Sequence, residues 1–129
     1  MPCTPLHRAC VRLTLILAAA FAGPLCAAEL PAGDPVRGQA LYQACTSCHS
    51  VDENDIGPKH RGVLGRRAGS IPDYNYSPAL KASGLTWDAA TLDRWLTNPQ
   101  ALVPGTKMFF QLPDRQQRAD LIAYLGQLK

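Results

Sequence analysis

The residues with the clearest chemistry are Cys45, Cys48 and His49, which form a Cys-x-x-Cys-His run. This spacing is typical of the attachment site of a c-type haem. Each thiol can form a thioether with one vinyl group of the porphyrin, and the adjacent imidazole can then be the fifth ligand of the iron. The run therefore predicts one covalently bound haem c, attached through Cys45 and Cys48, with His49 as an iron ligand.

The sequence offers few candidates for the sixth ligand. Once the leader described below is removed, Met108 is the only methionine and His60 the only other histidine. Met108 follows the irregular segment Pro104–Lys107, which can fold back over the opposite face of a porphyrin, whereas His60 follows His49 closely. We expect Met108 to bind the iron. His60, a lysine such as Lys107 and an open position are the alternatives, and Met108 could instead only fill core space.

A His/Met pair would determine the redox behaviour of the haem. A thioether is a soft ligand that favours Fe(II), so this pair raises the reduction potential relative to two histidines. Two protein ligands also leave no iron position for oxygen or peroxide. Such a site is suited to exchanging one electron and to little other chemistry.

Residues 1–28 have the pattern of a cleaved secretory signal peptide. A basic start, the apolar stretch 13–22 and small residues ending at Ala28 follow one another in the expected order. A retained membrane anchor fits less well because a spanning helix needs about 20 apolar residues. A lipid anchor on Cys26 is disfavoured by the bulky residue before it. Cleavage would leave one domain, 29–129, whose only cysteines are those of the haem motif, in the periplasm.

The charge of this domain is close to zero. Two of the 13 Lys and Arg residues lie in the leader and all 10 acidic residues follow it, so 11 basic and 10 acidic side chains give a net charge of +1. Nucleic-acid binding, which needs a basic surface, is therefore not expected. A domain of this size has a marginal core, so a buried macrocycle would supply much of its apolar interior.

Two regular helices are expected near the ends of the domain. Apolar residues at helical spacing indicate one over about 35–47, which would carry both cysteines at its end. Pro113-Asp114 would open another that runs to the C-terminus. The buried stripe of this last helix would be Leu121, Ile122, Leu125 and Leu128.

The middle of the domain is expected to hold short helices between long loops, with no strand. Residues 50–76 and 101–112 show no sustained period. A loop as long as 50–76 is uncommon in so small a domain unless it wraps a bound group. The expected helix limits are Ser77-Pro78 to Gly84 for one, and a cap at Thr86 with an end at Asn98-Pro99 for the other.

A series of short segments continues the haem motif along 33–129. It consists of Gly38-x-x-x-Tyr42-x-x-Cys45-x-x-Cys48-His49, Gly57-Pro58, Gly65-Arg66-Arg67-Ala68-Gly69, Tyr74-Asn75-Tyr76, Gly84-Leu85-Thr86-Trp87, Asn98-Pro99, Pro104-Gly105-Thr106-Lys107-Met108 and Arg118-Ala119-Asp120-Leu121-Ile122-Ala123-Tyr124-Leu125. In this order the series resembles class I cytochrome c, in the mitochondrial-type branch and its bacterial relatives. The resemblance implies an all-α cytochrome c fold, with about four to five helices wrapped around one haem and the N- and C-terminal helices crossing.

The resemblance also implies individual roles. Pro58 would accept a hydrogen bond from the free N–H of His49, fixing the ring and its tautomer, unless it only forms a Gly-Pro turn. Phe110 would cover the haem edge. A polar group formed by Arg66, Tyr76, Trp87 and Thr106 would hydrogen-bond the haem propionates, although Trp87 could equally be core. At the helix crossing, Gly38 and Tyr42 would meet Leu121 and Tyr124.

Three features depart from the family pattern. His60 stands where the family usually has an apolar residue, which places a titratable group near the haem. Trp95 stands near the methionine where the family often has tyrosine, so a hydrogen bond to the sulfur would come from an indole or not at all. The basic residues around the haem edge are few, so electron transfer should depend only weakly on salt.

The function expected from these features is that of a soluble electron carrier and not of an enzyme. It would act as a monomer and dock by its haem edge on larger membrane or periplasmic redox proteins, touching the membrane itself only if the leader is retained. A dedicated electron-transfer subunit of one dehydrogenase is a variant of this interpretation. The alternatives are a haem peroxidase or gas sensor with a labile sixth ligand, and a dithiol or zinc module.

Overall fold

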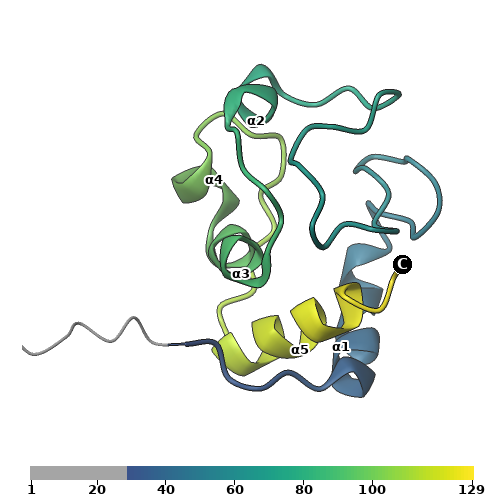
Figure 1. Cartoon of the computed structure of the whole chain (residues 1–129), viewed down its shortest axis with the longest axis vertical. Coiled ribbons are helices and arrows are strands. Elements are labelled where there is room, and N and C mark those ends of the chain that lie inside the picture. The colour runs from purple at the N-terminus through teal and green to yellow at the C-terminus, as the bar shows by residue number, and fades with distance from the viewer. Residues whose placement is uncertain (1–28) are drawn as a thin grey trace, which may run out of the picture.

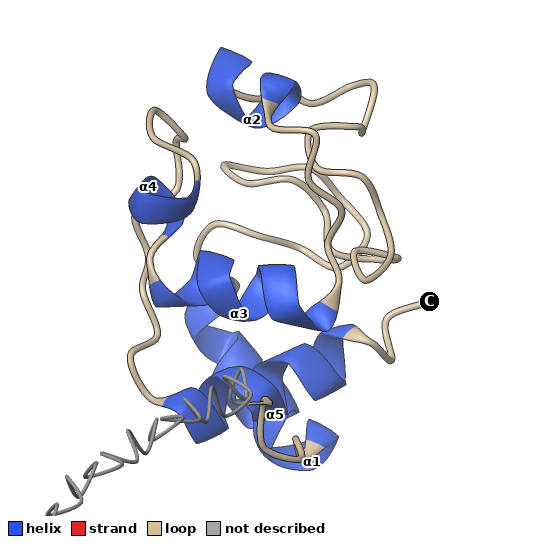
Figure 2. Cartoon of the chain, turned by 60° about the vertical axis from the view of Figure 1, so that its left-hand side comes forward, coloured by secondary structure: helices blue, strands red, loops and turns tan. Residues whose placement is uncertain are grey.

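The computed structural model describes residues 29–129, so the expected signal peptide lies outside the described residues. Within this range the chain is helical, with the elements α1 (Pro35–Tyr42), a 3-10 turn η1 (Gln43–Cys45), α2 (Pro78–Ala82), α3 (Ala89–Thr97), α4 (Pro99–Leu102) and α5 (Arg115–Leu125). Helices α1, α3 and α5 lie together at one end of the molecule, while α2 and long loops form the other (Figures 1 and 2). The all-α prediction is confirmed, and Arg67 and Thr86 form only an isolated antiparallel bridge.

Helices α1 and α5 cross at a glycine. A Cβ added to Gly38 would lie 2.0 Å from the backbone oxygen of Asp120 and 2.8 Å from Cβ of Tyr124, so only glycine lets the two backbones approach this closely. Beside it, the rings of Tyr42 and Tyr124 pack with their centroids 5.2 Å apart. Leu121 is only 1% exposed. The predicted crossing of the first and last helices is therefore present.

Buried charges also hold α5 in place, a feature that its apolar stripe did not indicate. Asp120 accepts hydrogen bonds from the backbone N–H of Asp34 (2.7 Å) and from the Arg37 guanidinium (2.7 and 2.9 Å). Arg118 donates to the Asp93 carboxylate on α3 at 2.6 Å. Because Asp120 and Arg118 are both paired, they can be buried beside the apolar stripe of α5. Three of the four predicted stripe residues are buried, and Leu128 is partly buried.

The helix boundaries differ from those expected. Helix α1 ends at Tyr42, earlier than predicted, because the chain tightens into the 3-10 turn that carries Cys45. Helix α3 is capped by Asp88 instead of Thr86, since the Asp88 carboxylate accepts from the N–H of Thr91 at 2.7 Å. Helix α5 stops at Leu125, short of the C-terminus.

Helix α4 lies partly in a segment that was predicted to be irregular. Asn98 ends α3 and also caps α4, because its side chain accepts from the N–H of Ala101 at 3.0 Å. Pro99 then occupies the first helical position, which suits its fixed φ. One asparagine therefore serves two helices, and α4 starts the return of the chain toward Met108.

Candidate haem site

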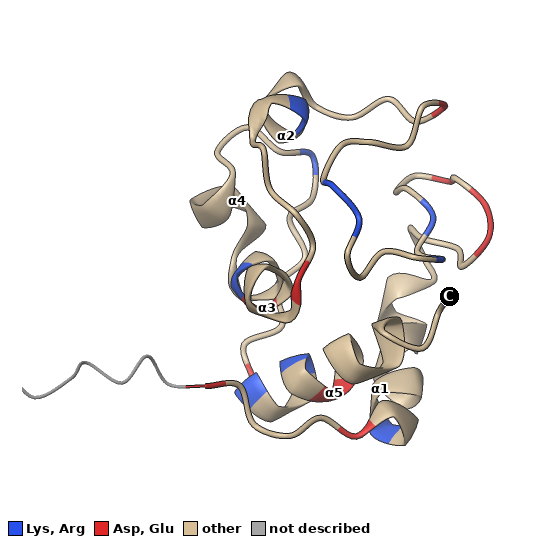
Figure 3. Ribbon diagram, in the orientation of Figure 1, with Lys and Arg blue, Asp and Glu red and all other residues tan. Residues whose placement is uncertain are grey.

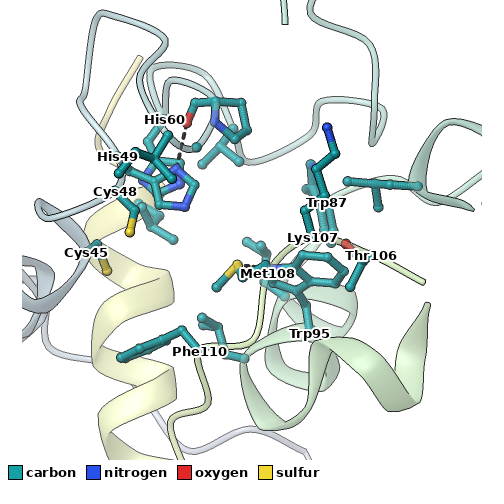
Figure 4. A pocket seen from close by; sticks show the side chains of 18 of the residues that line it. Cys45, Cys48, His49, His60, Trp87, Trp95, Thr106, Lys107, Met108 and Phe110 are labelled. Atoms are coloured by element: carbon teal, nitrogen blue, oxygen red, sulfur yellow. Dashed lines mark hydrogen bonds between the residues drawn. The ribbon is translucent and has the colours of Figure 1, made fainter. Parts of the chain in front are cut away.

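A cavity of about 260 Å³ lies between the helical end and the loops. Its walls are mainly aromatic and aliphatic side chains of segments far apart in the sequence. The cavity lining includes all the site residues indicated by the sequence, namely Cys45, Cys48, His49, Pro58, Arg66, Tyr76, Trp87, Thr106 and Met108. The site residues are thus brought together around one space (Figure 4).

The two cysteines and His49 project from one tight turn after α1. The backbone N–H groups of Cys48 and His49 both donate to the carbonyl of Cys45, at 3.1 and 2.8 Å. Burial raises the pKa of the Cys45 thiol to about 11, opposite to the shift that a reactive thiolate needs. Within residues 29–129 no three His, Cys, Asp or Glu side chains are grouped to hold a metal ion. The turn therefore fits thioether attachment better than a dithiol or zinc site.

The His49 ring is held in one orientation and one tautomer. Its Nδ1 lies 2.7 Å from the carbonyl oxygen of Pro58, which can only accept, so Nδ1 carries the proton and Nε2 keeps its lone pair. Burial lowers the pKa of His49. Gly57 lies so close that an added Cβ would be 2.2 Å from the ring atom Cε1. A neutral, fixed imidazole with one free nitrogen is what a metal ligand requires.

Met108 lies on the other side of the cavity from His49 (Figure 4). Its Sδ accepts a hydrogen bond from the indole N–H of Trp95 at 3.2 Å, so the indole alternative is the one present. Gln100, on α4, donates to the backbone oxygens of Thr106 and Met108 at 2.7 and 3.0 Å. The sequence did not indicate Gln100, although the Asn98-Pro99 cap could have revealed its helix.

The other candidates for a sixth ligand lie elsewhere. The His60 ring stacks on His49, with centroids 4.1 Å apart and an interplanar angle of 22°, and so lies on the same side of the cavity (Figure 4). Burial lowers the pKa of His60 to about 3, which keeps the ring neutral. Lys107 donates through Nζ to the carbonyl of Asn75 at 2.7 Å, linking two loops.

Arg66, Tyr76, Trp87 and Thr106 all line the cavity, and Trp87 and Thr106 lie away from the cysteines (Figure 4). The Arg66 guanidinium donates to the carbonyls of Lys59 and Arg61 at 2.9 and 3.0 Å, and burial lowers its pKa. Tyr76, Trp87 and Thr106 are all buried. A half-buried guanidinium beside hydroxyl and indole groups is suited to carboxylates such as haem propionates.

Exposed apolar side chains form the mouth of the cavity. Phe109 and Ile56 are 74% and 72% exposed, and Phe110, which also lines the cavity, is 39% exposed. Both basic and acidic residues occur along the loops (Figure 3). Within the described residues, no helix has the length and hydrophobicity to cross a bilayer.

Comparisons with known proteins agree with this geometry. Residues 35–129 match the family model described as cytochrome c. The chain is 52% identical over 104 residues to a cytochrome c2 of Rhodomicrobium vannielii, covering 78% of this chain and 83% of the relative, and 43% identical to cytochrome c 2.1 of Caenorhabditis briggsae, covering 76% and 91%. Among solved structures, it is 45% identical to cytochrome cH from Methylobacterium extorquens, covering 73% of this chain and 98% of that one with a TM-score of 0.71.

Proposed function

The chain belongs to the cytochrome c family and carries a haem c joined to Cys45 and Cys48, and on this premise we propose that it is an electron carrier whose iron is bound by His49 and Met108. The haem supplies the one-electron change between Fe(III) and Fe(II). The observation that carries the proposal is that a neutral imidazole and a thioether lie on opposite sides of one cavity.

Fixed protein ligands would keep the reorganisation energy of this electron exchange low. His49 is fixed by Pro58 and Gly57, and Met108 is fixed by Trp95 and Gln100, so neither ligand needs to move between oxidation states. An anchored methionine also leaves no position for oxygen or peroxide, which supports a carrier over a haem enzyme or gas sensor. Arg66, Tyr76, Trp87 and Thr106 would hold the propionates.

The partners are best described by their chemistry. The exposed apolar mouth, formed by Ile56, Phe109 and Phe110 with Lys107 nearby, would dock transiently on larger membrane or periplasmic redox proteins. A net charge near zero gives weak electrostatic steering. We infer that cleavage after Ala28 releases the domain 29–129 into the periplasm, where it acts as a monomer. A dedicated subunit of one dehydrogenase would use the same surface.

The replacement Met108→Ala tests the proposal. The native ferric protein should show the long-wavelength band of a thioether bound to Fe(III), and its reduced form should not bind carbon monoxide. The variant should lose the band, bind carbon monoxide and show a midpoint potential lower by about 0.1 V or more, since axial ligands set haem potentials over about 0.8 V. Phe109→Ala, which changes the exposed neighbour, should keep the native spectrum. An unchanged spectrum and midpoint in Met108→Ala would refute the ligand pair.

A further inference from the structure

His60 occupies an unusual place for an ionisable residue, directly against the His49 ring. The two rings are nearly parallel, with centroids 4.1 Å apart and an interplanar angle of 22°. Gly57 also presses on the same imidazole, since a Cβ there would lie 2.2 Å from Cε1. Together these two neighbours leave His49 little freedom to rotate.

His60 is itself fixed by the helix crossing. Its Nδ1 lies 3.1 Å from the hydroxyl of Tyr42, and the two rings meet edge to face with centroids 5.6 Å apart. Tyr42 is only 3% exposed and packs in turn on Tyr124 of α5. The His60 backbone is held as well, because its N–H donates to the carbonyl of Ser50 at 3.0 Å. A continuous set of contacts thus leads from the α1–α5 crossing to the His49 ring.

We propose that His60 is a positioning residue for the axial histidine: the helix crossing holds His60 through Tyr42, and His60 in turn holds the ring plane of His49. This inference rests on the proposed role of His49 as an iron ligand. An aliphatic residue of similar size would also fill the space, but it could neither bond to Tyr42 nor stack face to face. A polar ring beside His49 also stabilises the additional positive charge of the ferric state more than an aliphatic side chain does.

Three replacements separate these contributions in the haem-loaded protein. His60→Leu removes both the stacking and the hydrogen bond, His60→Phe keeps a ring without the bond, and Tyr42→Phe removes only the hydroxyl. The haem-methyl shifts of the ferric protein in paramagnetic NMR report the ring plane of an axial histidine. We expect His60→Leu to rearrange these shifts and to move the Fe(III)/Fe(II) equilibrium about threefold toward Fe(II), or about 30 mV at about 59 mV per tenfold. The rearrangement should be smaller in His60→Phe and in Tyr42→Phe.

Val103→Ala serves as the control, because Val103 is buried at 5% exposure but is not part of the cavity lining. It should lower the melting temperature without changing the haem-methyl pattern. If His60→Leu fails to retain haem, the haem-methyl shifts of Tyr42→Phe test the proposal instead, because this variant keeps every aromatic ring. Native haem-methyl shifts in the His60 and Tyr42 variants would overturn the proposal, whatever the melting temperatures. This result can be distinguished from a wrong ligand assignment. If His49 and Met108 did not bind the iron, the native protein itself would lack the spectrum of a His/Met-ligated haem.

Discussion

The helical end of the molecule (α1, α3 and α5) and its loop end (residues 46–77 and 103–114) are stabilised in different ways. The helical end has a backbone contact at Gly38, an apolar stripe on α5 and paired buried charges such as Arg118 with Asp93. The loop end is joined by side-chain hydrogen bonds to backbone oxygens, such as that from Lys107 to Asn75, and by the exposed ion pair of Arg61 with Asp52. Many of its side chains line the cavity, among them His49, Thr106 and Met108 (Figure 4). One apolar cluster joins both ends, but the helical end adds direct helix contacts to it, so we expect the loop end to depend more on the haem for its packing.

The largest expected effect follows from removing the haem attachment. In Cys45→Ala with Cys48→Ala the chain should carry no covalent haem, and the loop end should lose its packing surface. We expect amide hydrogen exchange in residues 50–76 to approach that of an unfolded chain, while α5 keeps more protection where it packs on α1. Exchange followed by mass spectrometry measures both ends in one sample. Cys45→Ala alone, with one thioether left, should lie between this variant and the native protein. Equal loss of protection at both ends would contradict the comparison.

The helical end was the part of the fold best predicted from the sequence. Periodic apolar residues indicate α1 and α5 because this pattern is local, whereas the crossing at Gly38 was implied by the resemblance to class I cytochrome c. The boundaries were less accurate, since Asp88 and Thr86 are both acceptable caps and the bridge of Thr86 to Arg67 helps to decide between them. Helix α4 was missed because four residues give too little periodicity to detect.

The candidate site shows a similar division. The sequence indicated which residues would line the cavity, because their types and order follow a family pattern, while their contacts with the haem stay a prediction. It did not indicate that Gln100 would hold the Met108 loop or that His60 would stack on His49. Both contacts depend on how the chain folds back on itself, and neither residue type marks that by itself.

A smaller effect is expected at low pH, where protonation of Asp120 should reduce the stability of the helical end. Hydrogen bonds from Arg37, and then from the backbone of Asp34, hold the pKa of Asp120 well below its usual range. In the unfolded chain this pKa is about 3.9, so the folded state favours the ionised carboxylate. The stabilisation is complete above that pH and is lost as the pH falls toward the folded pKa.

Asp120→Asn should therefore be less stable than the native protein at neutral pH and lose less stability on acidification from about pH 5 to about pH 2.5. Urea unfolding followed by circular dichroism at each pH measures both quantities. Asp73→Asn, at an exposed position of the loop end, should retain the native acid dependence. A native acid slope in Asp120→Asn would show that the charge cluster at the crossing does not supply this pH dependence.

The smallest expected effect tests how the two ends are coupled, because Trp95 reaches from α3 to Met108. Trp95→Phe keeps an aromatic ring beside Trp87 but removes the indole N–H that lies 3.2 Å from the Met108 sulfur. Without this donor a sulfur bound to the iron would give it more electron density, which would favour Fe(III). A hydrogen bond worth about 0.5–1 kcal/mol corresponds to a midpoint lower by about 20–40 mV. Spectroelectrochemical titration measures the shift.

A double-mutant cycle shows whether this shift acts through the sulfur. In a Met108→Ala background the indole has no sulfur to bind, so Trp95→Phe should leave the midpoint where it is. An equal shift in both backgrounds would mean that Trp95 acts on the haem by a route other than Met108. A shift confined to the native background would instead make one hydrogen bond the link through which the helical end adjusts the ligand that the loop end supplies.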